Sequence, residues 1–311
     1  MKKTVIAIAL ILAAAACDSS GPSITSDFPA FYLQDISTGA PPTSCGFLGG
    51  NGDIIAGAGT FLYFVDRDNG YVKAEVALGV PVTDVEGSPE GGYGLALSSD
   101  ELYVISNDIY TVHNKVLLPS YGSFIVPNPE STSVYVLCSN GMMAKIETVG
   151  WTVTKTGQTD AINPVGAVIG TSGQYVFAAD DKGVVYKIST VDFSTVAQTT
   201  VTGGVSGMCS TPLGEVFVSA EGASEVWAID CSTGQHSRTF DLDGYSTALA
   251  CTGSGKYLYA AIPGYGFSVL NTTDGTVEAE IGSFGDPVDM AVNSQTTRAV
   301  LCSLDLYILQ R

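Results

Sequence analysis

The chain has 311 residues, of which 45% are hydrophobic and 14% charged, with 36 glycines and 15 tyrosines. This composition is typical of a folded, turn-rich β protein and excludes a disordered chain. The formal net charge of −18 gives a surface that repels phosphate backbones and anionic headgroups, which argues against nucleic-acid partners and against electrostatic docking on a membrane.

The first seventeen residues are arranged like an export signal. Lys2 and Lys3 form a short basic segment, residues 4–16 are apolar, and three alanines directly precede Cys17. Thirteen apolar residues are too few to cross a hydrocarbon layer of about 30 Å as a helix. The segment resembles the signal of bacterial lipoproteins, which implies cleavage before Cys17 and attachment of lipid to the Cys17 sulfur. An ordinary secretory leader and an uncleaved anchor are the alternatives.

This resemblance implies three parts: a signal peptide (residues 1–16), the lipidated Cys17 with a flexible polar tether (residues 17–27), and one folded domain (residues 28–311). We therefore expect a membrane-anchored protein of the bacterial cell envelope, either periplasmic or at the cell surface. Asp18 resembles the inner-membrane retention signal of enterobacterial lipoproteins, but other lineages do not follow that rule, so the choice of membrane stays open.

Six further cysteines follow Cys17, and most end apolar runs such as VYVLC and AVLC, where a free cysteine behaves as a small buried hydrophobe. Six thiols allow fifteen pairings, and their spacing resembles no known disulfide framework. We expect mostly reduced, buried cysteines. The absence of CxxC and of Cys/His pairs argues against a zinc site. The six are Cys45, Cys138, Cys209, Cys231, Cys251 and Cys302.

A repeat of about 41 residues runs through the whole chain after the leader. Residues 216–256 contain four short β-rich runs separated by turn residues, at 216–220, 225–230, 236–242 and 245–251, which we interpret as one four-stranded antiparallel blade. When the first of these runs is aligned as the second strand of each repeat, its copies recur at intervals of 40, 40, 42, 41, 41 and 41 residues. Its copies begin near Asp53, Tyr93, Ser133, Tyr175, Val216, Tyr257 and Arg298.

In five of the repeats, the third strand ends in an apolar residue followed by a small polar or acidic one. Such a side chain can cap a hairpin turn by accepting a hydrogen bond from a nearby backbone amide. We predict this role for Asp66, Glu147, Ser189, Asp230 and Asn271.

The approaches to the second strands repeat as well, as in SPEGGYGLAL, TSGQYVFAA and TPLGEVFVS. These units resemble the bacterial surface-layer YVTN repeat, a relative of WD-type propeller repeats, and residues 216–230 match its pattern best. The second unit departs from the pattern, with a shorter turn and no Ile-Asp in residues 102–118. The resemblance covers residues 28–311 and implies a β-propeller of four-stranded blades, but it implies no chemistry.

The last repeat is incomplete, because only two strands, at 299–303 and 306–311, follow Arg298. The N-terminal segment 28–36 resembles the predicted strand that ends at Ile281, just before the last repeat, and Ile36 matches Ile281 in this comparison. We therefore predict an all-β, seven-bladed propeller in which this N-terminal strand completes the last blade and removes an open sheet edge. An open solenoid and a pair of sandwiches are the alternatives.

The sequence offers little catalytic chemistry. His113 and His236 fall in predicted outer strands, and no G-x-S-x-G, H-E-x-x-H or Walker motif is present. The glycines of residues 49–52 lie in a turn with no following helix, which phosphate binding would require. Trp151 and Trp227 occupy different phases of the repeat, so we expect them to serve in packing.

Residues 66–70, DRDNG, have oxygen-bearing side chains at alternate positions, as in a calcium loop, but the glycine comes early and no bidentate glutamate follows. Asp66 also aligns with the turn-capping positions, so we favour a structural role. Asp180, Asp181 and Asp286 are similarly weak candidates.

These observations predict no catalytic, cofactor-binding or metal-ligating residue and one lipidation site, Cys17. We expect an extracytoplasmic binding or scaffold module, anchored to the membrane by its lipid, for an envelope protein or an extracellular ligand. The alternatives are a lactonase- or dehydrogenase-like propeller enzyme and a surface-layer-associated structural protein. Charged side chains converging on the channel axis would count against a pure scaffold, and an apolar, filled channel against an enzyme.

Overall fold

The structure is a computed structural model that describes residues 27–50, 52–130, 132–282 and 284–311. The predicted signal peptide, Cys17 and all of the predicted tether except Asp27 lie outside these residues. Within the described part of the chain, no helix is long and apolar enough to cross a membrane.

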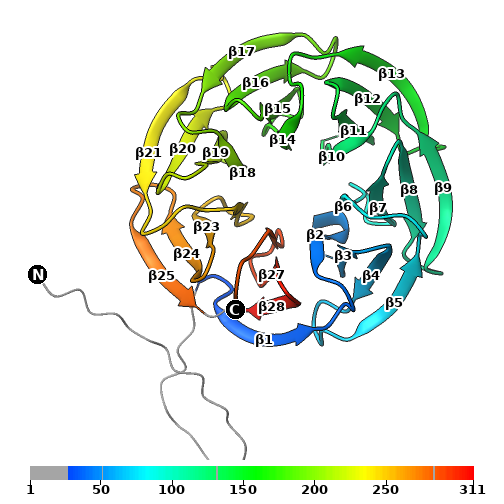
Figure 1. The fold of residues 1–311 in the computed structure, drawn as a ribbon, viewed down its shortest axis with the longest axis horizontal. Coiled ribbons are helices and arrows are strands. Elements are labelled where there is room, and N and C mark those ends of the chain that lie inside the picture. The colour runs from blue at the N-terminus through cyan, green and yellow to red at the C-terminus, as the bar shows by residue number, and fades with distance from the viewer. Residues whose placement is uncertain (1–26, 51, 131, 283) are drawn as a thin grey trace, which may run out of the picture.

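Seven antiparallel sheets of four strands each stand around a central axis (Figure 1). We number the sheets as blades in chain order and give the strands from the axis outward. Blade 1 has β2 (Pro42–Phe47), β3 (Ile54–Ala58), β4 (Phe61–Val65) and β5 (Val72–Ala77); blade 2 has β6 (Asp84–Gly87), β7 (Tyr93–Ser98), β8 (Glu101–Ser106) and β9 (Thr111–Leu117); blade 3 has β10 (Gly122–Pro127), β11 (Ser133–Cys138), β12 (Met142–Glu147) and β13 (Thr152–Gln158). Blade 4 has β14 (Pro164–Ile169), β15 (Tyr175–Asp180), β16 (Val184–Ser189) and β17 (Thr195–Thr200); blade 5 has β18 (Val205–Thr211), β19 (Glu215–Ala220), β20 (Glu225–Asp230) and β21 (His236–Asp241). Blade 6 has β22 (Ala248–Cys251), β23 (Tyr257–Ile262), β24 (Gly266–Asn271) and β25 (Val277–Gly282); blade 7 has β26 (Asp289–Val292), β27 (Arg298–Cys302), β28 (Leu306–Gln310) and β1 (Phe31–Ile36).

Differences in burial explain which strands were easiest to predict from the sequence. The second strand of a blade lies between two neighbouring blades, so both of its faces are covered and it reads as a continuous apolar run, as in the fully buried β11. An outer strand such as β17 alternates between half-buried and exposed residues, because one of its faces meets solvent. The second strands begin at the predicted residues or one residue away from them. The predicted fold class is confirmed.

The boundary predicted between repeats was wrong by one strand. Residues 216–251 were expected to form one blade, but β19, β20 and β21 belong to blade 5, whereas β22 is the innermost strand of blade 6. Local alternation and turn residues mark the strands, but they do not distinguish a hairpin within a sheet from a connection that crosses to the next sheet.

The N-terminal strand closes the ring as predicted. β1 pairs antiparallel with β28, from Phe31 opposite Gln310 to Ile36 opposite Leu306. In Figure 1, β1 lies on the rim outside β28, next to the C-terminus. This closure excludes both the open solenoid and the pair of sandwiches.

Segments before β1 also hold it in place. Phe28 packs edge-on against Tyr257, with the ring centroids 4.8 Å apart, and Tyr259 donates a hydrogen bond of 2.7 Å to the Pro29 carbonyl. Because both tyrosines belong to β23, the N-terminal segment is fixed to blade 6 before it completes blade 7.

The connections divide between two faces of the ring, since strand direction alternates within each blade. One face, which we call the interblade face, carries the turns between second and third strands and the connections from one blade to the next. The opposite face, the hairpin face, carries the other two turns of each blade.

Candidate functional site

A central channel of about 370 Å³ is lined by the innermost strands of all seven blades. Its wall is polar on the side of blades 7, 1 and 2, where Ser44, Asp84 and Asp289 lie. It is apolar on the side of blade 4, with Val165 and Val168. The channel is therefore neither apolar throughout nor filled. The carboxylates in the channel wall argue against a pure scaffold, in which the channel would have no function.

Three of these polar residues occupy the same position of the repeat in consecutive blades. Asp289, Ser44 and Asp84 each pair with the corresponding residue of their blade's second strand: Cys302, Gly57 and Leu97. We call these three residues the polar arc. The other four blades have Phe124, Gly166, Gly207 and Ala248 at this position.

Each residue of the polar arc binds the innermost strand of the following blade. Asp289 Oδ2 accepts the Cys45 amide at 2.9 Å, Ser44 Oγ accepts the Val85 amide at 3.2 Å, and Asp84 Oδ2 accepts the Ile125 amide at 2.7 Å. Ser44 also donates to Asp84 Oδ1 at 2.9 Å, and Asp289 Oδ1 accepts the Met290 amide at 2.8 Å. The arc thus joins four consecutive blades, from blade 7 to blade 3.

The pKa values of the carboxyl groups of this wall are raised above their ordinary values. Burial, opposed by the backbone amides that they accept, raises the pKa of Asp84 to about 7 and that of Asp289 to about 6. Burial and the neighbouring carboxylates of Asp84 and Asp289 raise the pKa of Glu86 well above its usual value. The described residues that line the channel include no lysine, arginine or histidine. This wall therefore disfavours anions.

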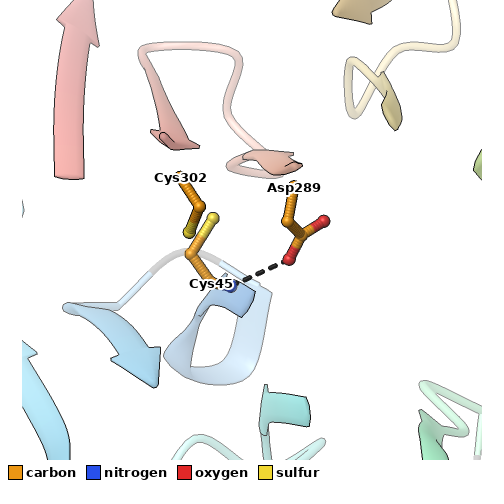
Figure 2. A group of neighbouring side chains, drawn as sticks. All are labelled: Cys45, Asp289 and Cys302. Atoms are coloured by element: carbon orange, nitrogen blue, oxygen red, sulfur yellow. Dashed lines mark hydrogen bonds between the residues drawn. The ribbon is translucent and has the colours of Figure 1, made fainter. Parts of the chain in front are cut away.

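Cys45, Asp289 and Cys302 converge at the junction of blades 7 and 1 (Figure 2). Their sulfur and carboxylate atoms lie within 4.8 Å of one another, and thiolate and carboxylate are ligand types that zinc accepts. However, both Asp289 oxygens accept backbone amides, the Cys45 thiol donates to the Val300 carbonyl at 3.8 Å, and burial raises the pKa of both thiols. The cluster as it stands packs blade 7 against blade 1.

Sequence spacing gave no signal for this cluster, because Cys45 and Asp289 are 244 residues apart. The only signal was the alignment of repeats, which places Cys302 opposite Asp289 across the β26–β27 pair and Cys45 one residue after Ser44 of the polar arc.

Both histidines lie on outer strands, as predicted. His113 is in β9 and its ring packs 5.1 Å from that of Tyr93. His236 begins β21, where its Nε2 is 2.9 Å from Thr239 Oγ1 and its ring is 4.4 Å from that of Trp227. Neither histidine lines the channel.

The two tryptophans serve in packing, as predicted. Trp151 is buried and lies edge-on to Tyr93, with centroids 5.3 Å apart. Trp227 is half-buried and donates from its indole nitrogen to Glu225 at 3.2 Å.

Four of the five predicted turn caps are confirmed. In the Asp66 turn, one carboxylate oxygen accepts the amides of Asp68 and Asn69 at 2.9 and 2.7 Å, so the loop that resembles a calcium site is held by its own backbone. Asp180 and Asp286 also accept backbone amides of nearby turns. The side chains that cap as predicted are those of Asp66, Ser189, Asp230 and Asn271.

The prediction for Glu147 was wrong. Its carboxylate accepts from Ser133 Oγ at 3.1 Å on the paired strand and forms an ion pair of 2.8 Å with Lys145. The extra methylene of glutamate carries the carboxylate away from the amides that a shorter side chain would reach.

The interblade face, near which the polar arc lies, carries exposed apolar side chains, three of them tyrosines. They come from six connections and are 46% to 73% exposed: Tyr121, Ile162, Tyr245, Tyr265, Val288 and Leu304. Exposed carboxylates lie in the same set of loops: Asp100, Asp160, Asp181, Glu221, Asp243 and Asp286. Among the described residues of these loops, Lys182 is the only basic side chain. The hairpin face also has exposed apolar residues, but Tyr71 is the only aromatic among those described.

No protein-family model and no curated protein matches the chain. Solved structures match its fold. A chain from the crystal structure of the mitotic checkpoint complex superposes with a TM-score of 0.79 at 12% identity, covering 97% of this chain and 98% of that one. Hydrazine synthase from Kuenenia stuttgartiensis contains a chain with a TM-score of 0.76 at 15% identity, covering 95% of this chain and 99% of that one. These identities show the fold alone, so membership in the YVTN-repeat family stays a prediction.

Proposed function

We propose that the protein is a lipid-anchored, extracytoplasmic propeller that binds a basic protein partner on its interblade face. The observation that carries this proposal is the group of exposed tyrosine and aliphatic side chains among carboxylates on that face. Tyrosine is enriched in the cores of protein interfaces, and carboxylates around an apolar patch favour a partner of opposite charge. One structural neighbour comes from a complex, the mitotic checkpoint complex, which accords with a propeller used for protein binding.

The position of the N-terminal segment supports the choice of this face. Asp27 pairs with Lys256 at 3.5 Å, and Lys256 lies in the turn between β22 and β23, on the hairpin face. The chain between Cys17 and Asp27 spans at most about 35 Å. A lipid on Cys17 would therefore hold the hairpin face toward the membrane and leave the interblade face directed away from it.

A propeller enzyme remains the alternative, because carboxyl groups with pKa values near neutrality can act as general acids and bases. The contacts of the polar arc favour binding over catalysis, since both carboxylate oxygens of Asp84 and of Asp289 already accept protein hydrogen bonds. A structural role in a surface layer would use the same interblade face for assembly.

We expect the triple variant Tyr121→Ser, Tyr245→Ser, Tyr265→Ser to lose at least nine-tenths of the partner captured from detergent-solubilised envelope by the intact lipoprotein. These side chains are exposed, so the variant should melt within a few degrees of the wild type. Quantitative mass spectrometry of the captured proteins, with cross-links mapped onto the bait, measures the effect.

The matched control carries Tyr71→Ser, Ile109→Ser and Leu213→Ser, which are equally exposed but lie on the hairpin face. It should capture the partner as the wild type does, and capture should weaken as salt is raised. Loss of the partner by the control and not by the interblade variant would refute the proposal.

The anchor has a separate test. Labelled palmitate should be incorporated into the wild type and into Cys231→Ala, whose thiol is partly exposed, but not into Cys17→Ala. The Cys17→Ala protein should also leave the membrane fraction. Label retained by Cys17→Ala would contradict lipidation at this residue.

A further inference from the structure

Two thiols face each other across the innermost strands of blades 5 and 6. The sulfur atoms of Cys209, in β18, and Cys251, in β22, lie 3.0 Å apart. A disulfide bond is about 2.05 Å long, so a shift of about 1 Å would bring the two sulfurs to bonding distance. The two residues are 42 positions apart, one more than the 41 that separate the equivalent residues Gly207 and Ala248 of the two strands.

Packing holds the two thiols in this position. Cys209 belongs to the apolar cluster between blades 5 and 6, together with Phe217, Leu249 and Leu258, and Cys251 packs against that cluster. In the contacts described here, neither sulfur binds a residue of the polar arc. The pair therefore has fixed geometry and no other role in the contacts described above.

The pair is also accessible. Both cysteines line the central channel, and Cys251 is the more exposed of the two. A small solute that enters the channel can thus reach the Cys251 sulfur first.

We propose that Cys209 and Cys251 form a redox-active pair whose oxidation to a disulfide joins blades 5 and 6 at the channel wall. The oxidant is a small disulfide compound. The inference is independent of the anchor and of the partner on the interblade face. It departs from the expectation of mostly reduced cysteines for this one pair.

The reaction is two successive thiol–disulfide exchanges. Cys251 loses its proton and its thiolate attacks one sulfur of the small disulfide, which breaks that S–S bond and releases the first small thiolate. Cys209 then loses its proton and attacks the Cys251 sulfur, which releases the second small thiolate. The two released thiolates take up the two protons, so two protein thiols are oxidised and one small disulfide is reduced to two thiols. Burial raises the pKa of the Cys209 thiol well above its usual value, so the second step should accelerate as pH rises.

The probe that we choose is cystamine, a small disulfide with two positive charges, because the carboxylates of the channel attract cations. The reduced full-length protein is treated with cystamine, unreacted thiols are alkylated, and the protein is analysed without reduction by mass spectrometry. Trypsin cuts between the two residues at Arg238, and a protease specific for glutamate separates Cys209 from Cys231 at Glu215, Glu221 or Glu225.

We expect two fewer alkylated cysteines, one peptide pair linking Cys209 to Cys251, and a melting temperature several degrees above that of the reduced protein, because the bond constrains the unfolded chain. Dithiothreitol should reverse all three changes. Cys209→Ala and Cys251→Ala should each remove both the linked peptide and the redox dependence of melting. The control Cys138→Ala, which alters a buried cysteine of blade 3, should retain both.

Three outcomes would overturn the proposal: Cys209 and Cys251 both alkylated after oxidation, a stable cysteamine adduct on Cys251 with Cys209 still alkylated, or a link between Cys45 and Cys302 in place of the expected one. Since the peptide map uses the wild-type protein, it decides the question even if a variant fails to fold.

Discussion

Replacing Ile36 by aspartate is expected to abolish the folded ring, whereas replacing its neighbour Asp35 by asparagine should leave stability unchanged. Ile36 is 7% exposed and packs in a cluster that joins blades 7 and 1, with Val300 and Ile308. An unpaired carboxylate buried there costs several kcal/mol, a large part of the roughly 5–15 kcal/mol that stabilises a typical protein. Asp35, on the same strand, is exposed.

Circular dichroism melts and size-exclusion chromatography measure this effect. The Ile36→Asp protein should be unfolded or aggregated at 25 °C, since loss of β1 leaves β28 as an open sheet edge. The Asp35→Asn protein should elute and melt as the wild type does. A folded, monomeric Ile36→Asp protein with an unchanged melting temperature would show that β1 does not close the ring.

The protein is expected to become more stable as pH falls from 8 to about 5. Asp84 and Asp289 have folded-state pKa values of about 7 and 6, above the ordinary value of 3.8, so between about pH 4 and 7 the folded protein binds more protons than the unfolded chain. The free energy of unfolding therefore rises as pH falls through this window. For Asp84 the gain is at most about 4 kcal/mol, reduced by the channel water that reaches its half-buried side chain.

Other carboxylates set the lower limit of this gain. The pKa values of several turn aspartates, including Asp66 and Asp230, are lowered by hydrogen bonds that they accept. Their contribution to stability is present above the ordinary pKa of 3.8 and is lost as pH falls below it. Maximum stability should thus lie near pH 5.

The variant Asp84→Asn tests whether Asp84 causes this pH dependence of stability. The amide oxygen can still accept the Ile125 amide, the amide nitrogen can donate to Ser44 Oγ, and no charge remains to be buried. This variant should melt above the wild type at pH 8 and should lose much of the pH dependence between pH 5 and 8. The control Asp100→Asn, which alters an exposed residue of the interblade face, should follow the wild type. If the melting temperatures of Asp84→Asn and of the wild type changed equally with pH between pH 5 and 8, Asp84 would not be the source of the pH dependence.

The fold could be predicted from the sequence because the second strands are buried on both faces and therefore have long apolar sequences that recur along the chain. The unfinished last repeat also required a partner strand from elsewhere in the chain. The phase of the blades could not be predicted, since a connection that crosses to the next sheet carries the same turn residues as a hairpin. Glu147 shows a related limit, because its place in the repeat predicted a cap that its side-chain length does not allow.

The polar arc and the Cys209–Cys251 pair were beyond prediction for a different reason. Ser44, Asp84 and Asp289 stand near the ends of connections, where polar residues are ordinary, and their common role is visible only when the register of each inner strand is known. The paired cysteines occupy positions that differ by one residue in the repeat, so aligning the repeats does not bring them together.

The way β1 enters the ring has a mechanical consequence. β1 runs from the hairpin face, where Asp27 meets Lys256, to the interblade face, where it leads into blade 1. A pull on the N-terminal segment, such as a membrane anchor would exert against a bound partner, acts along the axis of β1. It therefore loads the hydrogen bonds between β1 and β28 together, in shear, and does not peel them apart one at a time. The strand that closes the ring is thus oriented to bear tension between the anchor and the propeller.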